Sequence, residues 1–286
     1  MRRRAAFPLQ MSWLATGLAA LLGLAAPAAA HLAEARGPVT AAAPAHAPRT
    51  GPAISVVGLH DQPYPPHPVG TEARQPKHGP HGIPLAPQLL VGVPSGGIVA
   101  HRSPSRTSRS VGTVAATSKY YGFPIRIWVE ATNPKGTWGK VQLPYAWPRT
   151  DGWIPLRGLP RSRTDVVVSV DLSQHSVRVY RSGDLRYRVA GATGAASSPT
   201  PPGDYVVTDR VPFAGGALGT FAFGISGIQP RLPAGWSGGD QLAIHGTDEP
   251  WSIGRSVSAG CVRVSEWSLE HFRPLLQLGT PVIIRP

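Results

Sequence analysis

The chain has 286 residues, is 42% hydrophobic and carries a formal net charge of +13 at pH 7. This length is enough for more than one folded domain. Cys261 is the only cysteine, which excludes an intramolecular disulfide and a metal site built from several cysteines. The cysteine is therefore either a buried apolar side chain or an unpaired thiol that is available for chemistry.

Residues 1–30 show the pattern of a secretory signal peptide. Three arginines follow Met1, a run of Leu, Ala and Gly follows from Trp13 to Ala26, and small residues resembling a cleavage site end it. An uncleaved membrane anchor is the alternative, but the run is shorter than the roughly 20 residues that a spanning helix needs. We therefore expect a secreted protein of the cell wall or periplasmic space, with no stable membrane span after signal cleavage.

Residues 31–87 are rich in proline, alanine and histidine. They contain 12 of the 32 prolines and six of the ten histidines. Histidine-rich tracts can bind metal, but these histidines have no repeated spacing. The composition favours an extended linker that holds the folded part of the chain away from the export site.

Residues 88–162 contain short β-like runs between turn signals, which predicts a small β-barrel. The expected strands are 96–100, 110–114, 125–129, 138–143 and 152–156. The succession of "V-G-T-V", "T-W-G-K-V" and "D-G-W-I-P-L" resembles a bacterial SH3-like domain, a type of module that is often wall-binding or a spacer. An insertion, Tyr145 to Pro148, either pads a turn or lines a ligand groove.

The basic surplus lies in this same part of the chain. Residues 88–163 hold 11 basic and two acidic side chains, whereas residues 164–286 hold ten of each. Nucleic acid is one partner for such a basic patch, but an exported protein rarely meets it, so we expect no nucleic-acid partner. Anionic cell-wall polymers are a better candidate, and a surface that is basic only for solubility remains the alternative.

Residues 164–286 are predicted to form one mainly β domain with a single core. A meander of strands is expected at 166–170, 176–180 and 185–189, followed by strands that include 204–207 and 282–284. The one predicted helix covers 266–272, with Ser265 as its N-cap and its end near Pro274.

His245 and Cys261 are the candidate catalytic pair of this segment. His245 follows the strand-like run 241–244, sixteen residues before the cysteine. A free thiol is mostly protonated near pH 7, and a neighbouring imidazole can take its proton. Gly260 permits a tight turn in which backbone amides converge on an oxyanion. The two other histidines of this segment, His175 and His271, are expected in a turn and on the helix surface.

The motifs around this pair resemble the L,D-transpeptidase catalytic domain, the YkuD-like family. "I-H-G-T" followed by "S-I-G-R-x-V-S-x-G-C-V-R-V" is similar to the signature of the family. "V-S-V-D-L-S-Q-H-S-V-R-V-Y-R-S-G", "T-G-A-A-S-S-P-T-P-P-G-D-Y" and "G-G-A-L-G" resemble its other conserved stretches, in the order of the family. The resemblance spans 166–286 and implies a β-sandwich with one short helix.

The resemblance also implies roles for individual residues. Cys261 would be the nucleophile, His245 the general base and later the general acid, and the carbonyl of Gly246 would orient the imidazole. Ser258 would brace the loop, the amides of Gly260 and Cys261 would bind the oxyanion, and Arg263 would help bind the stem peptide. No metal or organic cofactor is implied.

The implied activity is the formation of 3→3 crosslinks between peptidoglycan stem peptides through a cysteine thioester, with carbapenem-type molecules as inhibitors. With water as acceptor, the same chemistry would be that of an L,D-carboxypeptidase. The family commonly reads S-H-G-C where this chain has Ala259, so a catalytically decayed wall-binding protein is a further alternative. Papain-like peptidases place cysteine before histidine, and sortases separate histidine and cysteine by a longer interval.

Overall fold

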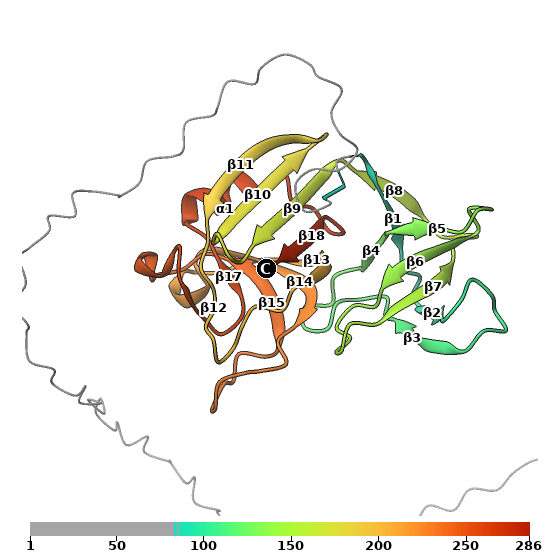
Figure 1. Ribbon diagram of the computed structural model, residues 1–286, viewed down its shortest axis with the longest axis horizontal. Helices are drawn as coiled ribbons and strands as arrows, with labels where there is room; N and C mark the ends of the chain where they lie inside the picture. Colours follow the sequence, from blue (N-terminus) through green and yellow to red (C-terminus); the bar gives the residue numbers. More distant parts are fainter. Residues whose placement is uncertain (1–82, 85) are drawn as a thin grey trace, which may run out of the picture. The chain divides into compact units, whose positions relative to one another are not determined.

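The structure is a computed structural model that describes Ile83, Pro84 and residues 86–286. The predicted signal peptide and nearly all of the predicted linker lie outside the described residues. All described residues belong to one compact unit, which consists mainly of β-strands (Figure 1). Within this part of the chain, no helix is long and apolar enough to cross a membrane.

The first group of strands, here called the first segment, covers residues 88–164. It forms a three-stranded sheet in the order β4-β1-β8 and a five-stranded sheet in the order β3-β2-β7-β6-β5. Side chains from both sheets share one apolar core. The strands are β1 (Gln88–Gly92), β2 (Ile98–His101), β3 (Ser110–Val114), β4 (Arg126–Val129), β5 (Ala131–Thr132), β6 (Trp138–Gln142), β7 (Asp151–Pro155) and β8 (Arg161–Thr164).

Each of the five strands predicted in this segment is present, as β2, β3, β4, β6 and β7, with small shifts at the ends. Buried and more exposed residues alternate along β6 and β7, which is the pattern that made these strands predictable. β1, β5 and β8 were not predicted. The resemblance to an SH3-like barrel stays a prediction.

The second group, the second segment, is built on an eight-stranded sheet in the order β11-β10-β9-β18-β13-β14-β15-β17, and β12 pairs with β16 beside it. The predicted strands of this segment are present, and the predicted helix is α1. The strands are β9 (Val166–Asp171), β10 (Ser176–Arg181), β11 (Asp184–Ala190), β12 (Thr193–Gly194), β13 (Gly203–Pro212), β14 (Phe221–Ile228), β15 (Gln241–His245), β16 (Ser256–Ser258), β17 (Val262–Arg263) and β18 (Pro281–Arg285). The helical elements are η2 (Gly216–Leu218), η3 (Pro250–Ser252) and α1 (Glu266–Phe272).

α1 covers part of this sheet through its apolar face. The Ser265 hydroxyl accepts a hydrogen bond from the Ser268 amide at 3.2 Å, which is the capping interaction that starts the helix. Leu269 and Phe272 are fully buried in one cluster with side chains of the sheet. The first turn of the helix is thereby fixed close to the end of β15.

The order of the last strands brings the predicted catalytic residues together. β15 runs antiparallel to β14 and parallel to the short β17. In that parallel pair Ile244 lies opposite Val262, and His245 lies opposite Arg263. Cys261 directly precedes β17, so the sheet register places it opposite Ala243, two residues before His245.

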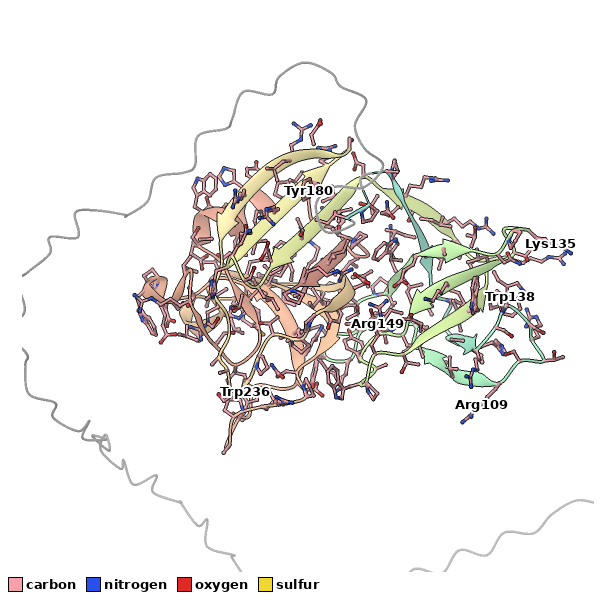
Figure 2. All side chains as sticks on the ribbon, in the orientation of Figure 1. Arg109, Lys135, Trp138, Arg149, Tyr180 and Trp236 are labelled. Carbon is pink, nitrogen blue, oxygen red and sulfur yellow. The ribbon has the colours of Figure 1, made fainter. Side chains whose placement is uncertain are left out.

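Contacts between the two segments involve the insertion from Tyr145 to Pro148, for which the sequence left two roles open. The Tyr145 amide donates to the Ser226 carbonyl at 2.7 Å, and Arg149, labelled in Figure 2, pairs with Asp204 at 2.8 Å. The buried Ser118 hydroxyl donates to the Asp209 carboxyl group. Tyr145 therefore belongs to the junction between the segments, and it is not among the residues that line the cavity described next.

Candidate active site

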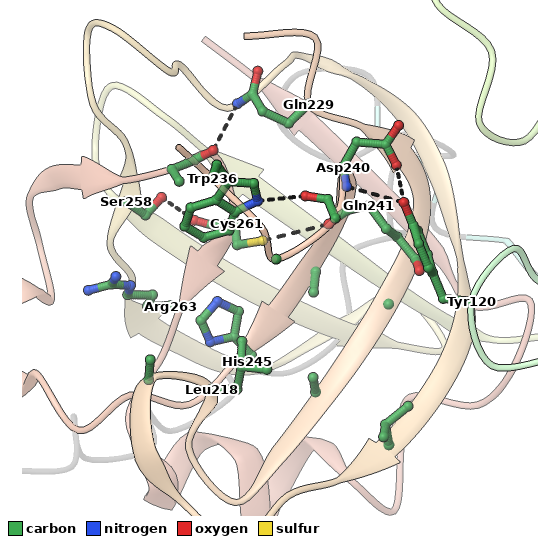
Figure 3. Close-up of a pocket in the computed structure, with 18 of the residues that line it drawn as sticks. Tyr120, Leu218, Gln229, Trp236, Asp240, Gln241, His245, Ser258, Cys261 and Arg263 are labelled. Atoms are coloured by element: carbon green, nitrogen blue, oxygen red, sulfur yellow. Dashed lines mark hydrogen bonds between the residues drawn. The ribbon is translucent and has the colours of Figure 1, made fainter. Parts of the chain in front are cut away.

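A cavity of about 200 Å³ contains both Cys261 and His245. Its walls come from the end of β15, the turn before β17, the loop between β14 and β15, η2, and two tyrosines of the first segment. Figure 3 shows Arg263 and Ser258 on one side of Cys261, and Gln241, Asp240 and Tyr120 on the other. The thiol therefore lies between two different flanks of one cavity.

His245 is the last residue of β15, and its side chain is buried with 4% exposure. Its Nδ1 lies 2.6 Å from the carbonyl oxygen of Gly246, which assigns the ring proton to Nδ1 and leaves the lone pair on Nε2. Burial lowers the pKa of His245 to about 4, assisted by the charge of Arg263, while Gly246 and Glu266 oppose the shift. The imidazole is therefore neutral at pH 7, as a general base must be.

Gly246 lacks a side chain for a steric reason. A Cβ at this position would overlap the Glu266 carboxylate and approach Leu269 to 2.8 Å. Glu266, in the first turn of α1, accepts hydrogen bonds from the Thr220 amide. The helix start therefore packs directly on the turn that orients the imidazole.

The thiol of Cys261 is protonated in this environment. Burial raises its pKa, and the Ala243 backbone and the Arg263 charge only partly oppose this. Its Sγ lies 3.9 Å from the Gln241 carbonyl oxygen. The hydrogen bonds of the described residues include none between Sγ and His245, so proton transfer requires the thiol to leave that carbonyl.

The turn that carries Cys261 is closed by Ser258. The Ser258 hydroxyl donates to the Cys261 carbonyl at 2.6 Å and accepts from the Gly260 amide at 3.1 Å. Gly260 has a φ of 122°, and a Cβ there would overlap the Gln229 side chain, so this position requires glycine. The Gly260 amide is thus engaged in the turn, whereas the described contacts give the Cys261 amide no partner.

Gln229 lines the cavity and supports the turn that carries Cys261, a role that the sequence did not predict. Its buried Nε2 lies within hydrogen-bond distance of three carbonyl oxygens: Ser198 at 3.2 Å, Pro199 at 3.0 Å and Ala259 at 3.2 Å. Thr200 adds a second brace, since its hydroxyl donates to the Gly260 carbonyl at 2.8 Å. The turn is held at the main chain of Ala259, so its position does not depend on a polar side chain there.

Arg263 faces the same cavity from β17. One of its terminal nitrogens pairs with Glu249, while its buried Nε has no hydrogen-bond partner among the described residues. A buried N–H group without a partner is costly.

The two other histidines of this segment lie away from the cavity. His175 has a φ of 48° in a turn, and its Nε2 lies 2.9 Å from the Ser256 hydroxyl. His271, on α1, stacks on Trp267 with a centroid distance of 3.9 Å. In the described part of the chain, no cluster of three or more His, Cys, Asp or Glu side chains is arranged to hold a metal ion.

Comparison with known proteins adds independent information on the second segment. Residues 165–284 match the sequence model of the L,D-transpeptidase catalytic domain, YkuD. A Bacillus licheniformis protein that bears the name L,D-transpeptidase YkuD is 29% identical over 119 residues, which are 42% of this chain and 65% of that protein. Its Bacillus subtilis namesake is 29% identical over 93 residues, 32% of this chain and 49% of that protein. The chain therefore spans about half to two thirds of the length of these curated relatives.

Solved L,D-transpeptidase structures also match part of this chain. An L,D-transpeptidase from Mycobacterium tuberculosis H37Rv is 21% identical, covers 56% of this chain and 90% of its own, and has a TM-score of 0.37. L,D-transpeptidase 3 of the same species, solved with a faropenem-derived adduct, is 18% identical, covers 56% and 91%, and has a TM-score of 0.37. The family match and the curated relatives support an enzyme of the transferase class, and residues 165–284 are the part of the chain that is similar to L,D-transpeptidase catalytic domains.

Proposed function

We propose that this protein is an exported peptidoglycan L,D-transpeptidase that forms 3→3 crosslinks through a thioester on Cys261. The observation that carries the proposal is the meeting of the thiol with a neutral, Gly246-oriented imidazole in one cavity. The family match of the surrounding domain supports the substrate class, the stem peptides of peptidoglycan.

In the first half-reaction Cys261 attacks the carbonyl at the L-centre of the diamino acid in a tetrapeptide stem. Its proton passes to Nε2 of His245, and the sulfur forms a bond to the carbonyl carbon. The C–N bond to the terminal D-alanine then breaks, and the imidazolium gives its proton to the leaving amine. Arg263, which lines the same cavity, binds an oxygen of the donor peptide.

The tetrahedral intermediate needs hydrogen-bond donors for its oxyanion. The Cys261 amide is available for this role. The Gly260 amide contributes only if it leaves the Ser258 hydroxyl, to which it donates at 3.1 Å. Ser258 itself holds the turn in the shape that the attack requires.

In the second half-reaction a side-chain amine of another stem attacks the thioester. The new C–N bond forms, the C–S bond breaks, and the amine proton passes through His245 to the thiolate. Water in place of the amine gives a tripeptide, the product of an L,D-carboxypeptidase.

The test is to incubate the purified protein with stem tetrapeptides and to analyse the products by mass spectrometry. We expect a crosslinked dimer, with loss of D-alanine, and an acylated Cys261 after treatment with a carbapenem. The Cys261→Ala variant should fold normally and form neither product. A large loss of stability in that variant would instead indicate a structural cysteine.

A decayed, wall-binding protein is the second candidate, because Ala259 stands where the family commonly has histidine. The main-chain brace from Gln229 argues against decay, since it holds this turn without an imidazole. Binding to insoluble cell wall without acylation of Cys261 would favour decay.

The basic first segment is the proposed contact with anionic wall polymers outside the cytoplasmic membrane. Eight of its basic side chains make no ion pair among the described residues, and Arg109 and Lys135 project outward in Figure 2. These eight are Arg102, Arg106, Arg109, Arg126, Lys135, Arg157, Arg161 and Arg163. Sedimentation with wall material should weaken with rising salt, as screening of exposed charges requires, and a salt-independent result would contradict an ionic contact.

A further inference from the structure

Tyr120 belongs to the first segment, yet it lines the cavity that contains the thiol. It lies between β3 and β4, and 47% of it is exposed. The neighbouring Tyr121 lines the same cavity and is 51% exposed. The first segment, which resembles a wall-binding or spacer module in the sequence, therefore supplies part of the wall of the candidate active site.

Hydrogen bonds to Asp240 hold Tyr120 in place (Figure 3). Its hydroxyl donates to the Asp240 carboxylate at 2.6 Å and accepts from the Asp240 amide at 3.3 Å. Lys119 binds both oxygens of the same carboxylate, at 2.8 and 3.0 Å. Burial raises the pKa of Asp240, but these hydrogen bonds outweigh it and lower the pKa, so the Lys119–Asp240 pair stays charged and internally neutralised.

Trp236 continues the surface that Tyr120 begins. Its indole nitrogen donates to the Gly239 carbonyl at 2.7 Å, and 47% of the residue is exposed. A Cβ on Gly239 would lie 3.3 Å from the Tyr120 ring, so the two aromatic side chains are anchored to the same short stretch of the loop. Rings that are fixed at a polar edge and open at the face form a preorganised binding surface.

The two flanks of Cys261 differ in chemistry. The Arg263 flank is polar, with the Ser258 hydroxyl and a guanidinium group that pairs with Glu249. The Tyr120 flank is mainly aromatic and apolar, and its only charged groups neutralise each other. A hydrocarbon chain therefore fits this second flank better than a carboxylate does.

We propose that Tyr120 is a specificity-determining residue that binds the acyl acceptor. The methylene groups of an amine-bearing side chain of a second stem pack on its ring, which directs the terminal amine to the Cys261 thioester. This inference rests on the proposed function. The amine forms the new C–N bond, the C–S bond breaks, and the released proton passes through His245 to the sulfur.

This role has a measurable consequence, because a positioned amine competes with water for the thioester. The full chain is given tetrapeptide stems, and the ratio of crosslinked dimer to hydrolysed tripeptide is measured by mass spectrometry. In Tyr120→Ala we expect this ratio to fall about tenfold, the effect of losing one well-placed aromatic contact. The rate of acylation by faropenem should stay within about twofold of the wild-type rate.

Two further variants sharpen the test. Tyr120→Phe keeps the ring but loses both hydrogen bonds to Asp240, so its ratio should lie between those of the wild type and Tyr120→Ala. Trp147→Ala removes a 55% exposed aromatic side chain of the same segment that does not line the cavity, and it should leave the ratio unchanged. An unchanged ratio in Tyr120→Ala, or a parallel loss of acylation, would overturn the inference. A wild-type protein that is never acylated would instead overturn the proposed function.

Discussion

At the scale of single residues, the two groups of the candidate catalytic pair are both uncharged at rest. Burial lowers the pKa of His245 to about 4 and raises the pKa of Cys261 above its ordinary value of 9.0. A thiolate–imidazolium pair would need the opposite shifts, a higher imidazole pKa and a lower thiol pKa. In the proposed reaction, the proton therefore moves only when substrate is attacked.

We expect the reactivity of Cys261 to rise continuously with pH. Below its pKa, the thiolate fraction increases about tenfold for each pH unit. Alkylation by iodoacetamide should therefore accelerate from pH 6 to pH 8 without a plateau, measured by intact-protein mass spectrometry. An alkylation rate that is constant from pH 6 to pH 8 would show a preformed thiolate–imidazolium pair. It would contradict the pKa shifts of Cys261 and His245.

His245→Ala separates the two kinds of thiol chemistry. Transfer of the stem peptide should slow by about 10²–10⁴-fold, the usual contribution of a general base. Alkylation at high pH should change little, because the thiolate forms there without a base. Equal losses in both reactions would indicate that the histidine only supports the fold.

The residue types of the candidate catalytic pair have a signal in the sequence, but several of their neighbours have none. A lone cysteine, a strand-end histidine and an adjacent glycine carry recognisable chemistry. Gln229 and Tyr120 lie in connecting segments with no periodic pattern, and they reach the site through contacts with residues at least 30 positions away. Such contacts have no local signal in the chain.

At the scale of elements, glycine explains why β14 was not predicted. The strand spans Phe221–Ile228 and is almost fully buried, but Gly224 and Gly227 interrupt the run of apolar residues that would indicate a strand. A Cβ on Gly224 would approach Asp209 and Gln241 within 3 Å, and one on Gly227 would approach Tyr205 at 2.7 Å. Residues that usually weaken a strand are needed here because neighbouring side chains occupy the space.

Gln229 is one of the side chains that hold the turn from Ser258 to Cys261, so Gln229→Ala should damage it. Three carbonyl groups near this turn would lose their shared donor, at a cost of about 1–3 kcal/mol. We expect a lower urea midpoint together with slower acylation of Cys261. A variant with normal acylation would show that the turn keeps its shape without this brace.

Ala259→His is the matched control, because it restores the residue that the family commonly has at the same turn. The main chain of Ala259 is already held by Gln229, so the added imidazole should change acylation less than Gln229→Ala does. A large gain in activity from Ala259→His would instead identify Ala259 as the defect of a decayed site.

At the scale of the whole molecule, the junction between the two segments is connected to the active site. Asp209 is fully buried and accepts hydrogen bonds from Ser118, from Thr208 at 2.7 Å and from Gln241 at 2.6 Å. Ser118 belongs to the first segment, while the Gln241 carbonyl is the partner of the thiol. One carboxyl group thus links the first segment to the position of Cys261.

This connection predicts that a change in the first segment alters both stability and reactivity. Ser118→Ala removes two hydrogen bonds, one to the Asp209 carboxyl group and one from the Phe123 amide, and should cost about 1–3 kcal/mol in urea unfolding. It should also change the alkylation rate of Cys261, because Gln241 loses part of its support. The exposed Ser110→Ala in the same segment should alter neither quantity. If Ser118→Ala lowers stability but leaves the thiol unchanged, the junction is purely structural, and Tyr120 reaches the cavity without any coupling through Asp209.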